Sequence, residues 1–322
     1  MTRIFKPVLL ALALCVPPLA CAQNWPAKPV RVLVGLAAGG GVDLVARIFT
    51  AKLADALGQP FIVENRLGGG SIVAIESTVR AAPDGYSLLF SPNGAMVMSP
   101  TIYRNLSYAP LRDLAPIALA VTFPLVVSIN ANLPVKSVSE LVAWLKANRG
   151  KANCAGTSQT FQMAISLLTS RTGTECTFIQ YKGNTETALA LMSGDVHFAL
   201  VDTGPIFAAI KSGKVRGIAV TTPTRDVTFT DIPTVIEAGF PELEMRFWMG
   251  LFAPLKTPAA IARRLETEMQ RIVNLPEVVQ QLHSRQVAPS GLGSEEFSKF
   301  IATEISRWDA IRKAANIAQI DQ

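Results

Sequence analysis

Two series of alternating strand and helix patterns constrain the fold of this chain more than any other feature. In the first series, apolar β-type runs lie near residues 30–34, 61–63 and 87–90. In the second series, they lie near residues 152–155, 177–181, 196–202 and 217–221. Helical patterns separate these runs, and such alternation predicts parallel sheets covered by helices. Two extended segments with little helix between them, 117–120 and 125–128, divide the two series. The sequence therefore predicts two α/β lobes joined by strand-like crossovers, with one wide sheet as the alternative.

The C-terminal third of the chain is predicted to be mainly helical. Apolar periodicity places helices over residues 258–273, 276–284 and 294–315. Two α/β lobes leave a cleft between the carboxyl ends of both sheets, and this is where open α/β folds bind ligands. We therefore expect a binding site at the loops that follow the strands.

Composition excludes several classes of protein. The chain has 322 residues, of which 49% are hydrophobic and 17% charged, so it has enough apolar material for a large core and is too apolar to be disordered. No apolar run reaches the roughly 20 residues of a bilayer span. The two histidines, His197 and His283, are not beside a G-x-S-x-G motif, and the four cysteines form no Cys-x-x-Cys pair. The dispersed net charge of +6 gives no support for nucleic-acid binding. We expect no metal, no cofactor and no enzyme activity.

The first 22 residues are typical of a secretion signal. Arg3 and Lys6 precede a short apolar stretch, and Ala20-Cys21-Ala22 supply the small-x-small cleavage pattern. We therefore predict export, with residues 1–22 as the signal peptide and cleavage after Ala22. A buried N-terminal helix and a lipoprotein acylated on Cys21 are the alternatives.

A glycine-rich loop, Ala37-Ala38-Gly39-Gly40-Gly41-Val42-Asp43, joins the first predicted strand to the first long helix. Its glycines allow a tight turn with uncovered N–H groups, and the helix N-terminus adds partial positive charge. This combination suits a carboxylate or a phosphate. The loop is neither G-x-G-x-x-G nor G-x-x-x-x-G-K-[ST], which disfavours a nucleotide. A tight turn without a ligand is the other interpretation.

The chain resembles a known family from this loop onward. The segment Trp25-Pro26-Ala27-Lys28-Pro29-Val30-Arg31, the glycine-rich loop and Ala46-Arg47 are similar to the start of the Bug (TctC-like) family, extracytoplasmic binding proteins of tripartite tricarboxylate transporters. Further matches follow in order along the chain: Val63-Glu64-Asn65-Arg66, Pro83-Asp84-Gly85-Tyr86, Leu133-Pro134, Tyr181-Lys182-Gly183, Gly213-Lys214-Val215-Arg216, Pro233-Thr234-Val235, Glu237-Ala238-Gly239, Trp248-Met249-Gly250 and Ala253-Pro254.

The resemblance implies a fold and a function. The fold is a two-lobed α/β periplasmic-binding-protein fold (Venus flytrap, type II), each lobe a mainly parallel sheet flanked by helices. Residues 23–122 with 222–322 form the first lobe and residues 123–221 the second. Such a protein resides in the periplasm, binds a small organic acid or amino acid in the interlobe cleft, and hands it to membrane permease subunits. We expect a monomer that binds no nucleic acid.

The resemblance also implies two sets of ligand-binding residues. The first is the glycine-rich loop, here Leu36, Ala37, Ala38, Gly39, Gly40 and Asp43. The second is a hydroxyl-rich loop, here Gly156, Thr157, Ser158 and Thr160. Its hydroxyls and the helix start after it are good neutral donors for an anion, although they also suit simple helix capping. This second loop is shorter than is usual in the family, and Gln162-Met163 replace the usual His-Leu, so the second-lobe pocket is expected to differ.

Three further residues are candidates for the cleft. Asn93 follows a strand and is a side-chain donor to a ligand or a turn residue. Asp202 ends another strand, where it accepts from a ligand ammonium or hydroxyl, or caps a helix. Trp248 roofs the cleft or packs in the core.

Cys154 and Cys176 are predicted to form a disulfide. They are the only cysteines outside the signal, and an exported chain folds where thiols oxidise. Each lies at one of two consecutive predicted strands with a single helix between them. Such strands are usually neighbours in a right-handed βαβ unit, about 5 Å apart. Two buried free thiols are the alternative.

Three functions are compatible with these observations. A periplasmic receptor for a carboxylate-bearing metabolite is favoured. An exported α/β enzyme acting on an anionic substrate lacks a recognisable pair of nucleophile and base. A ligand sensor that uses the same fold without transport is the third. The ligand itself stays open among mono-, di- and tricarboxylates, amino acids and aromatic acids.

Overall fold

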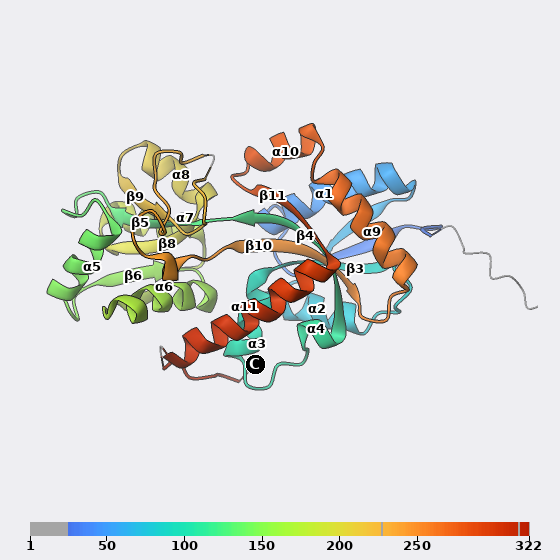
Figure 1. Cartoon of the computed structure of the whole chain (residues 1–322), viewed down its shortest axis with the longest axis horizontal. Coiled ribbons are helices and arrows are strands. Elements are labelled where there is room, and N and C mark those ends of the chain that lie inside the picture. The colour runs from blue at the N-terminus through green and yellow to red at the C-terminus, as the bar shows by residue number, and fades with distance from the viewer. Residues whose placement is uncertain (1–24, 227, 315, 322) are drawn as a thin grey trace, which may run out of the picture.

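The computed structural model describes residues 25–226, 228–314 and 316–321 (Figure 1). The predicted signal peptide and its cleavage site lie outside the described residues. Among the residues that are described, no helix is long and apolar enough to cross a membrane.

Two α/β lobes make up the described chain. The first contains a six-stranded sheet of order β11-β4-β10-β3-β1-β2. Its strands are β1 (Val30–Val34), β2 (Phe61–Asn65), β3 (Ser87–Pro92), β4 (Leu114–Phe123), β10 (Phe247–Pro254) and β11 (Ala288–Gly293). Its helices are α1 (Gly41–Leu57), α2 (Ile72–Val79), α3 (Ser99–Ile102), α4 (Pro110–Asp113), α9 (Ala259–Ile272), α10 (Pro276–His283) and α11 (Ser294–Ala314), with the short helical turns η1 (Gly69–Ser71) and η2 (Gly94–Met98). A third short turn, η3 (Pro241–Leu243), lies in the segment that leads from the second lobe into β10.

The second lobe contains a five-stranded sheet of order β7-β6-β8-β5-β9. Its strands are β5 (Leu125–Asn130), β6 (Asn153–Gly156), β7 (Thr177–Gln180), β8 (Phe198–Asp202) and β9 (Val215–Val220). Its helices are α5 (Val138–Ala147), α6 (Gln159–Thr172), α7 (Asn184–Ser193) and α8 (Thr203–Lys211). Ser137 caps the N-terminus of α5, where its hydroxyl accepts a hydrogen bond from the Glu140 amide.

The two-lobed α/β architecture is confirmed, but the sheets are mixed rather than mainly parallel. In the first lobe β1 pairs in parallel with β2 and β3, whereas β10 runs antiparallel to both β3 and β4. In the second lobe β6 is parallel to β7 and β8, and β5 is antiparallel to β8 and β9. The antiparallel strands include those that carry the chain between the lobes, since β4 leads into β5 across Pro124 alone and β10 returns beside β4 (Figure 1).

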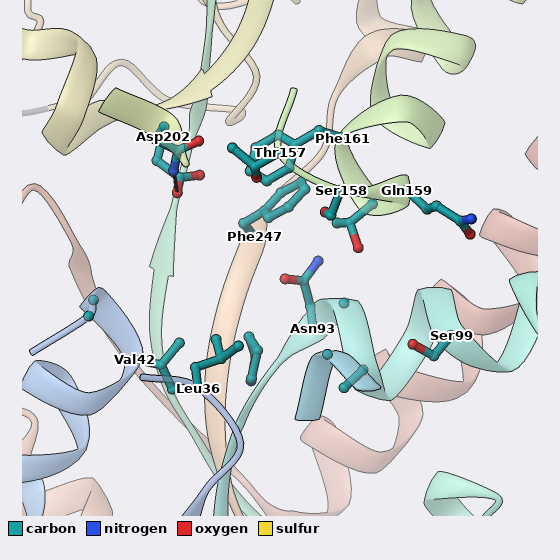
Figure 2. Close-up of a pocket in the computed structure, with 18 of the residues that line it drawn as sticks. Leu36, Val42, Asn93, Ser99, Thr157, Ser158, Gln159, Phe161, Asp202 and Phe247 are labelled. Carbon is teal, nitrogen blue, oxygen red and sulfur yellow. Dashed lines mark hydrogen bonds between the residues drawn. The ribbon is translucent and has the colours of Figure 1, made fainter. Parts of the chain in front are cut away.

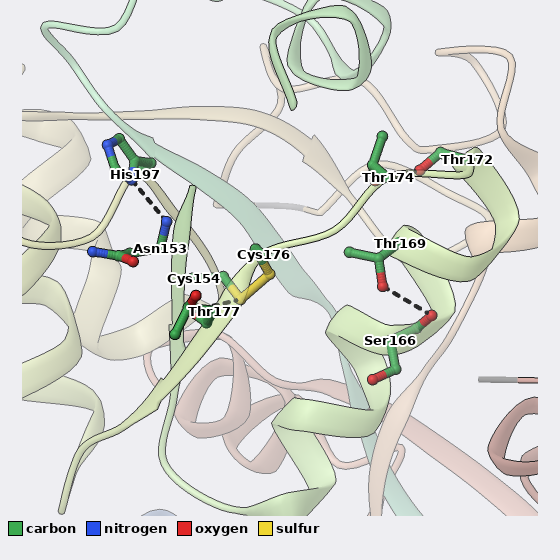
Figure 3. Close-up of a disulfide and its surroundings, with 9 residues drawn as sticks. All are labelled: Asn153, Cys154, Ser166, Thr169, Thr172, Thr174, Cys176, Thr177 and His197. Atoms are coloured by element: carbon green, nitrogen blue, oxygen red, sulfur yellow. Dashed lines mark hydrogen bonds between the residues drawn. A yellow bond between two sulfur atoms is a disulfide. The ribbon is translucent and has the colours of Figure 1, made fainter. Parts of the chain in front are cut away.

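The disulfide between Cys154 and Cys176 is present (Figure 3). Strands β6 and β7 are parallel neighbours, with Asn153 paired to Thr177, and the two cysteine Cα atoms are 5.9 Å apart. The βαβ reasoning therefore placed the two thiols correctly. The bridge joins the two strands that lead into Thr157 and Lys182 at the cleft.

Candidate ligand-binding site

A cavity of about 610 Å³ lies between the two lobes (Figure 2). Loops at the ends of strands from both sheets line it, as the topology predicts. Of the residues predicted from the sequence, seven line this cavity: Leu36, Gly40, Asn93, Thr157, Ser158, Thr160 and Asp202. The volume lies within the range of small-molecule sites, roughly 300–1,000 Å³.

The glycine-rich loop presents the N-terminus of α1 to the cavity. Gly40 is the N-cap residue and has no side chain with which to cap the helix. The first main-chain bond of the helix runs from the Leu44 amide to the Gly40 carbonyl, so the amides of Gly41 and Val42 have no acceptor within the helix. Both residues line the cavity. Uncovered amides and the helix dipole make this end of the cavity suitable for a carboxylate.

Asp43 supports the loop from behind instead of facing the cavity. The side chain is buried and accepts hydrogen bonds from the Gly39 amide at 2.9 Å and from the Asn65 side chain at 2.9 Å. The Arg47 guanidinium donates to both carboxylate oxygens at 2.9 and 3.0 Å. The hydrogen bonds from Arg47 are the largest cause that lowers the pKa of Asp43 to about 2. Asn65 also donates to the Leu36 carbonyl, which fixes the loop to β2.

The hydroxyl-rich loop brings a second helix N-terminus from the opposite lobe. Ser158 is the N-cap of α6, but its side chain makes no capping hydrogen bond. The amides of Phe161 and Gln162 both donate to the Ser158 carbonyl, so the amides of Gln159 and Thr160 lack a helical acceptor. Simple side-chain capping therefore does not account for these hydroxyls, which stay available at the cavity.

Asn93 lies at the end of β3 with its side chain directed into the cavity (Figure 2). The residue is 2% exposed, and its Nδ2 has no hydrogen-bond partner. A buried amide donor without a partner costs free energy, on the order of 1–3 kcal/mol, which a ligand oxygen would recover.

Asp202 lies at the end of the cavity opposite Leu36 and Val42 (Figure 2). It precedes α8 but makes no capping hydrogen bond, so the capping interpretation does not apply. Its Oδ2 accepts from Asn184 Nδ2 at 2.6 Å, and its Oδ1 is enclosed without a partner. Burial raises the pKa of Asp202 to about 6, against the lowering effect of the Asn184 hydrogen bond.

Ionisable groups around Asp202 are few. Leu125 of strand β5 pairs with Asp202, and β5 carries no titrating side chain. Strand β6 carries none either, because its Cys154 is disulfide-bonded. Lys211 is at the far end of α8. Glu186 of α7 accepts from the backbone amide of Lys182. Lys182 is therefore the cation that shares the cavity with Asp202, and it is exposed at the rim.

The other predicted residues do not line the cavity. Ala37, Ala38 and Gly39 are exposed on the outer side of the loop, and Asp43 supports it. Gly156 is buried at the end of β6, where an added Cβ would meet Phe161 Cβ at 2.5 Å. Trp248 is not a roof of the cleft: it is fully buried, and its ring packs edge-on against Phe297 at a centroid distance of 5.0 Å.

Sequence reasoning missed two features of the cavity. Gly69 and Gly70 line it from the loop after β2, where a run of three glycines repeats the pattern seen after β1. Three phenylalanines form an aromatic wall, and they come from the end of β4, the start of α6 and the start of β10: Phe123, Phe161 and Phe247. Only the fold brings these rings together, so no local signal identified them. Among the described residues, no three His, Cys, Asp or Glu side chains gather as metal ligands.

Two α/β lobes around a cleft that presents helix N-termini define a periplasmic binding protein. The Tripartite tricarboxylate transporter family receptor (TctC) model matches residues 45–317, and the chain belongs to this family of solute-binding receptors, which are not enzymes. The periplasmic binding protein BugD is 28% identical, with a TM-score of 0.77 over 92% of this chain and 100% of that one.

Two relatives have been solved with carboxylates. The R. palustris protein Rpa4515 with adipate is 28% identical, with a TM-score of 0.81 over 92% of this chain and 100% of that one. MatC (Rpa3494) from Rhodopseudomonas palustris with bound malate is 29% identical, with a TM-score of 0.76 over 89% of this chain and 99% of that one.

Proposed function

We propose that this protein is a periplasmic receptor that binds a small carboxylate-bearing metabolite between its lobes and delivers it to a tripartite tricarboxylate-type permease. Residues 1–22 would direct its export. The observation that carries the proposal is the convergence, on one cavity, of two helix N-termini without side-chain caps and the unpartnered Asn93 amide. Each supplies N–H donors without a competing charge, which is the chemistry that a carboxylate needs.

The relatives support the ligand class. Adipate and malate, the ligands of the two R. palustris proteins, are both carboxylates. In our proposal the ligand carboxylate lies against Gly41, Val42 and Asn93 in the first lobe, while the Thr157–Thr160 loop approaches from the second. The N–H donors of Gly41, Val42 and Asn93 belong to the first lobe and those of the Thr157–Thr160 loop belong to the second. An anion bound by both sets would therefore hold the lobes together.

Contacts between the lobes support a closing motion. Thr160 lies against Gly94 on one side of the cavity, where a Cβ on Gly94 would be 3.0 Å from Thr160 Oγ1. Elsewhere Thr203 donates its hydroxyl to the Gln286 carbonyl at 3.1 Å. The first is a close approach of small residues and the second a single hydrogen bond, so both can break when the lobes separate about the β4–β5 and β10 crossovers. Closure over a ligand gives the permease a means to distinguish loaded from empty receptor.

Substitution of Gly41 tests the position of the anion. No atom lies within 4 Å of a Cβ built on Gly41, so the fold accommodates Gly41→Val. The added side chain places bulk beside the amides that we propose to bind the carboxylate. Ala51→Val, at an exposed position of the same helix, is the matched control. Calorimetric titration with a panel of mono- and dicarboxylates should show binding by the wild type and the control, weakened about tenfold or more in Gly41→Val. Equal affinities in a folded Gly41→Val variant would place the anion elsewhere.

A further inference from the structure

The aromatic wall restricts which carboxylate the cavity accepts. The rings of Phe161 and Phe247 stack with centroids 5.6 Å apart and planes at 29°, and Phe123 packs on Phe247 at 6.0 Å. Phe161 belongs to the second lobe, whereas Phe247 starts the strand that returns to the first. A ligand between the lobes therefore contacts the parts of these rings that line the cavity. Aromatic side chains bind flat apolar bodies through offset or edge-on contacts, which add about 0.5–1.5 kcal/mol per pair beyond simple burial.

The polar groups at the two ends of the cavity differ in chemistry. The end formed by Gly41, Val42 and Asn93 offers the uncapped amides of α1 and the unpartnered Asn93 Nδ2 as N–H donors. The other end offers the Asp202 Oδ1, an enclosed acceptor without a donor. Figure 2 shows Phe247 between Asp202 and Asn93. The cavity thus has N–H donors at one end, an enclosed acceptor at the other and an aromatic wall between them, and the Thr157–Thr160 loop adds hydroxyl and N–H donors from the second lobe.

A second ligand carboxylate does not suit the acceptor end. Asp202, with a pKa of about 6, is mainly ionised at neutral pH and repels another anion. Lys182 is the cation among the described residues that line the cavity, and because it is exposed at the rim, water and salt screen its charge. A hydroxyl or amino group would instead satisfy Oδ1, and leaving such a buried acceptor unpaired is costly.

We propose that this receptor selects an aromatic monocarboxylate that carries a hydrogen-bond donor, a hydroxyl or an amino group, on the ring away from the carboxylate. This inference rests on the proposed function and adds the ligand class. The carboxylate contacts the α1 amides and Asn93, the ring lies against Phe161 and Phe247, and the donor reaches Asp202 Oδ1. The cavity of about 610 Å³ accommodates one substituted ring together with ordered water.

Calorimetric titration with matched acids tests the proposal. The probes are benzoate, its meta- and para-hydroxy and amino derivatives, terephthalate and adipate. At neutral pH the wild type should bind a hydroxy- or aminobenzoate about tenfold or more tighter than benzoate, terephthalate or adipate, because only these acids pair both ends of the cavity. Comparison of the affinities for the hydroxybenzoates and the aminobenzoates shows which donor group the site prefers.

Variants assign the preference to named residues. Asp202→Ala should abolish the advantage of the hydroxyl or amino group over benzoate, and Asp202→Asn, which keeps a neutral acceptor, should restore part of it. Phe247→Leu should weaken the aromatic acids about fivefold or more while changing adipate little. Phe229→Leu is the control, since Phe229 is about as buried and its ring packs at a tilt against Phe207, but it does not line the cavity.

The outcomes separate the two proposals. Adipate or terephthalate binding as tightly as the hydroxy- and aminobenzoates would overturn the inference and leave a carboxylate receptor standing. Equal affinity for benzoate and its derivatives, or an unchanged preference in Asp202→Ala, would overturn it as well. Failure of every acid in this panel, and of the mono- and dicarboxylates used in the Gly41→Val titration, to bind the folded wild type would overturn the proposed function together with it.

Discussion

Reduction of the Cys154–Cys176 disulfide should lower the stability of the protein and weaken ligand binding together. The bridge closes a loop of 22 residues that contains all of α6. It also joins β6 to β7, and the segments that follow these strands supply Thr157, Ser158 and Lys182 to the cavity. Loss of the bridge therefore acts on both loops of the second lobe at once.

The expected magnitude follows from the loop length. Chain-entropy estimates for a loop of this size give about 3 kcal/mol. Unfolding entropy is about 2.1 cal/mol/K per residue, so a chain of about 300 residues that unfolds as one unit should lose about 5 °C in Tm. If the second lobe, about 100 residues, unfolds alone, the same free energy lowers its Tm by about 15 °C. The size of the shift thus reports whether the lobes unfold together.

Calorimetry of oxidised and dithiothreitol-treated protein measures this shift on one sequence, and intact mass after alkylation counts the free thiols. A Cys154→Ala/Cys176→Ala variant is the control, because its Tm should not respond to dithiothreitol. Two alkylated cysteines in protein never exposed to reductant, or a reduced protein with unchanged Tm, would refute the reasoning.

Three further outcomes are expected. Asp43→Asn should lower the free energy of unfolding at neutral pH by about 2 kcal/mol, because the folded-state pKa of Asp43, about 2, lies below its unfolded value of 3.8. Urea titrations should show the difference from wild type vanish as pH falls through about 2. The advantage of hydroxybenzoate over benzoate should shrink in calorimetry as pH falls below about 6, since protonation of Asp202 removes its charge. Small-angle scattering should show the particle contract when a binding acid is added, and an unchanged radius with proven binding would contradict lobe closure.

Local sequence patterns were sufficient to predict two of the polar loops that line the cavity. The glycines of the first loop and the hydroxyls of the second each follow a strand directly. In an open α/β sheet, a loop at the carboxyl end of a strand lies at the cleft whatever its own sequence. The disulfide was predictable for the same reason, because consecutive strands of a βαβ unit are usually neighbours. The supporting role of Asp43 behind the loop was not predicted, because its partner Asn65 belongs to the next strand and a single sequence does not show that pairing.

The strands of the C-terminal third were harder to predict. Strand β10 is buried along its whole length and has no polar alternation, and β11 contains Pro289 and two glycines. Both strands pair with β4, more than a hundred residues earlier in the chain. Their place in the sheet depends on these distant pairings, which local propensity does not specify. The mixed character of the first sheet was missed for this reason.

The sequence offered Trp248 as a residue of the cleft, but its neighbour Phe247 lines the cavity instead, because strand register decides which side chain faces it. Successive side chains of a strand point to opposite faces, so Phe247 and Met249 line the cavity while Trp248 packs against Phe297 in the core. The register is set by pairing with β4, where Phe247 lies opposite Phe123. A shift of one residue would turn the tryptophan toward the ligand and bury the phenylalanine. The residue that faces the cavity at this crossover is therefore fixed by a pairing between strands far apart in the sequence.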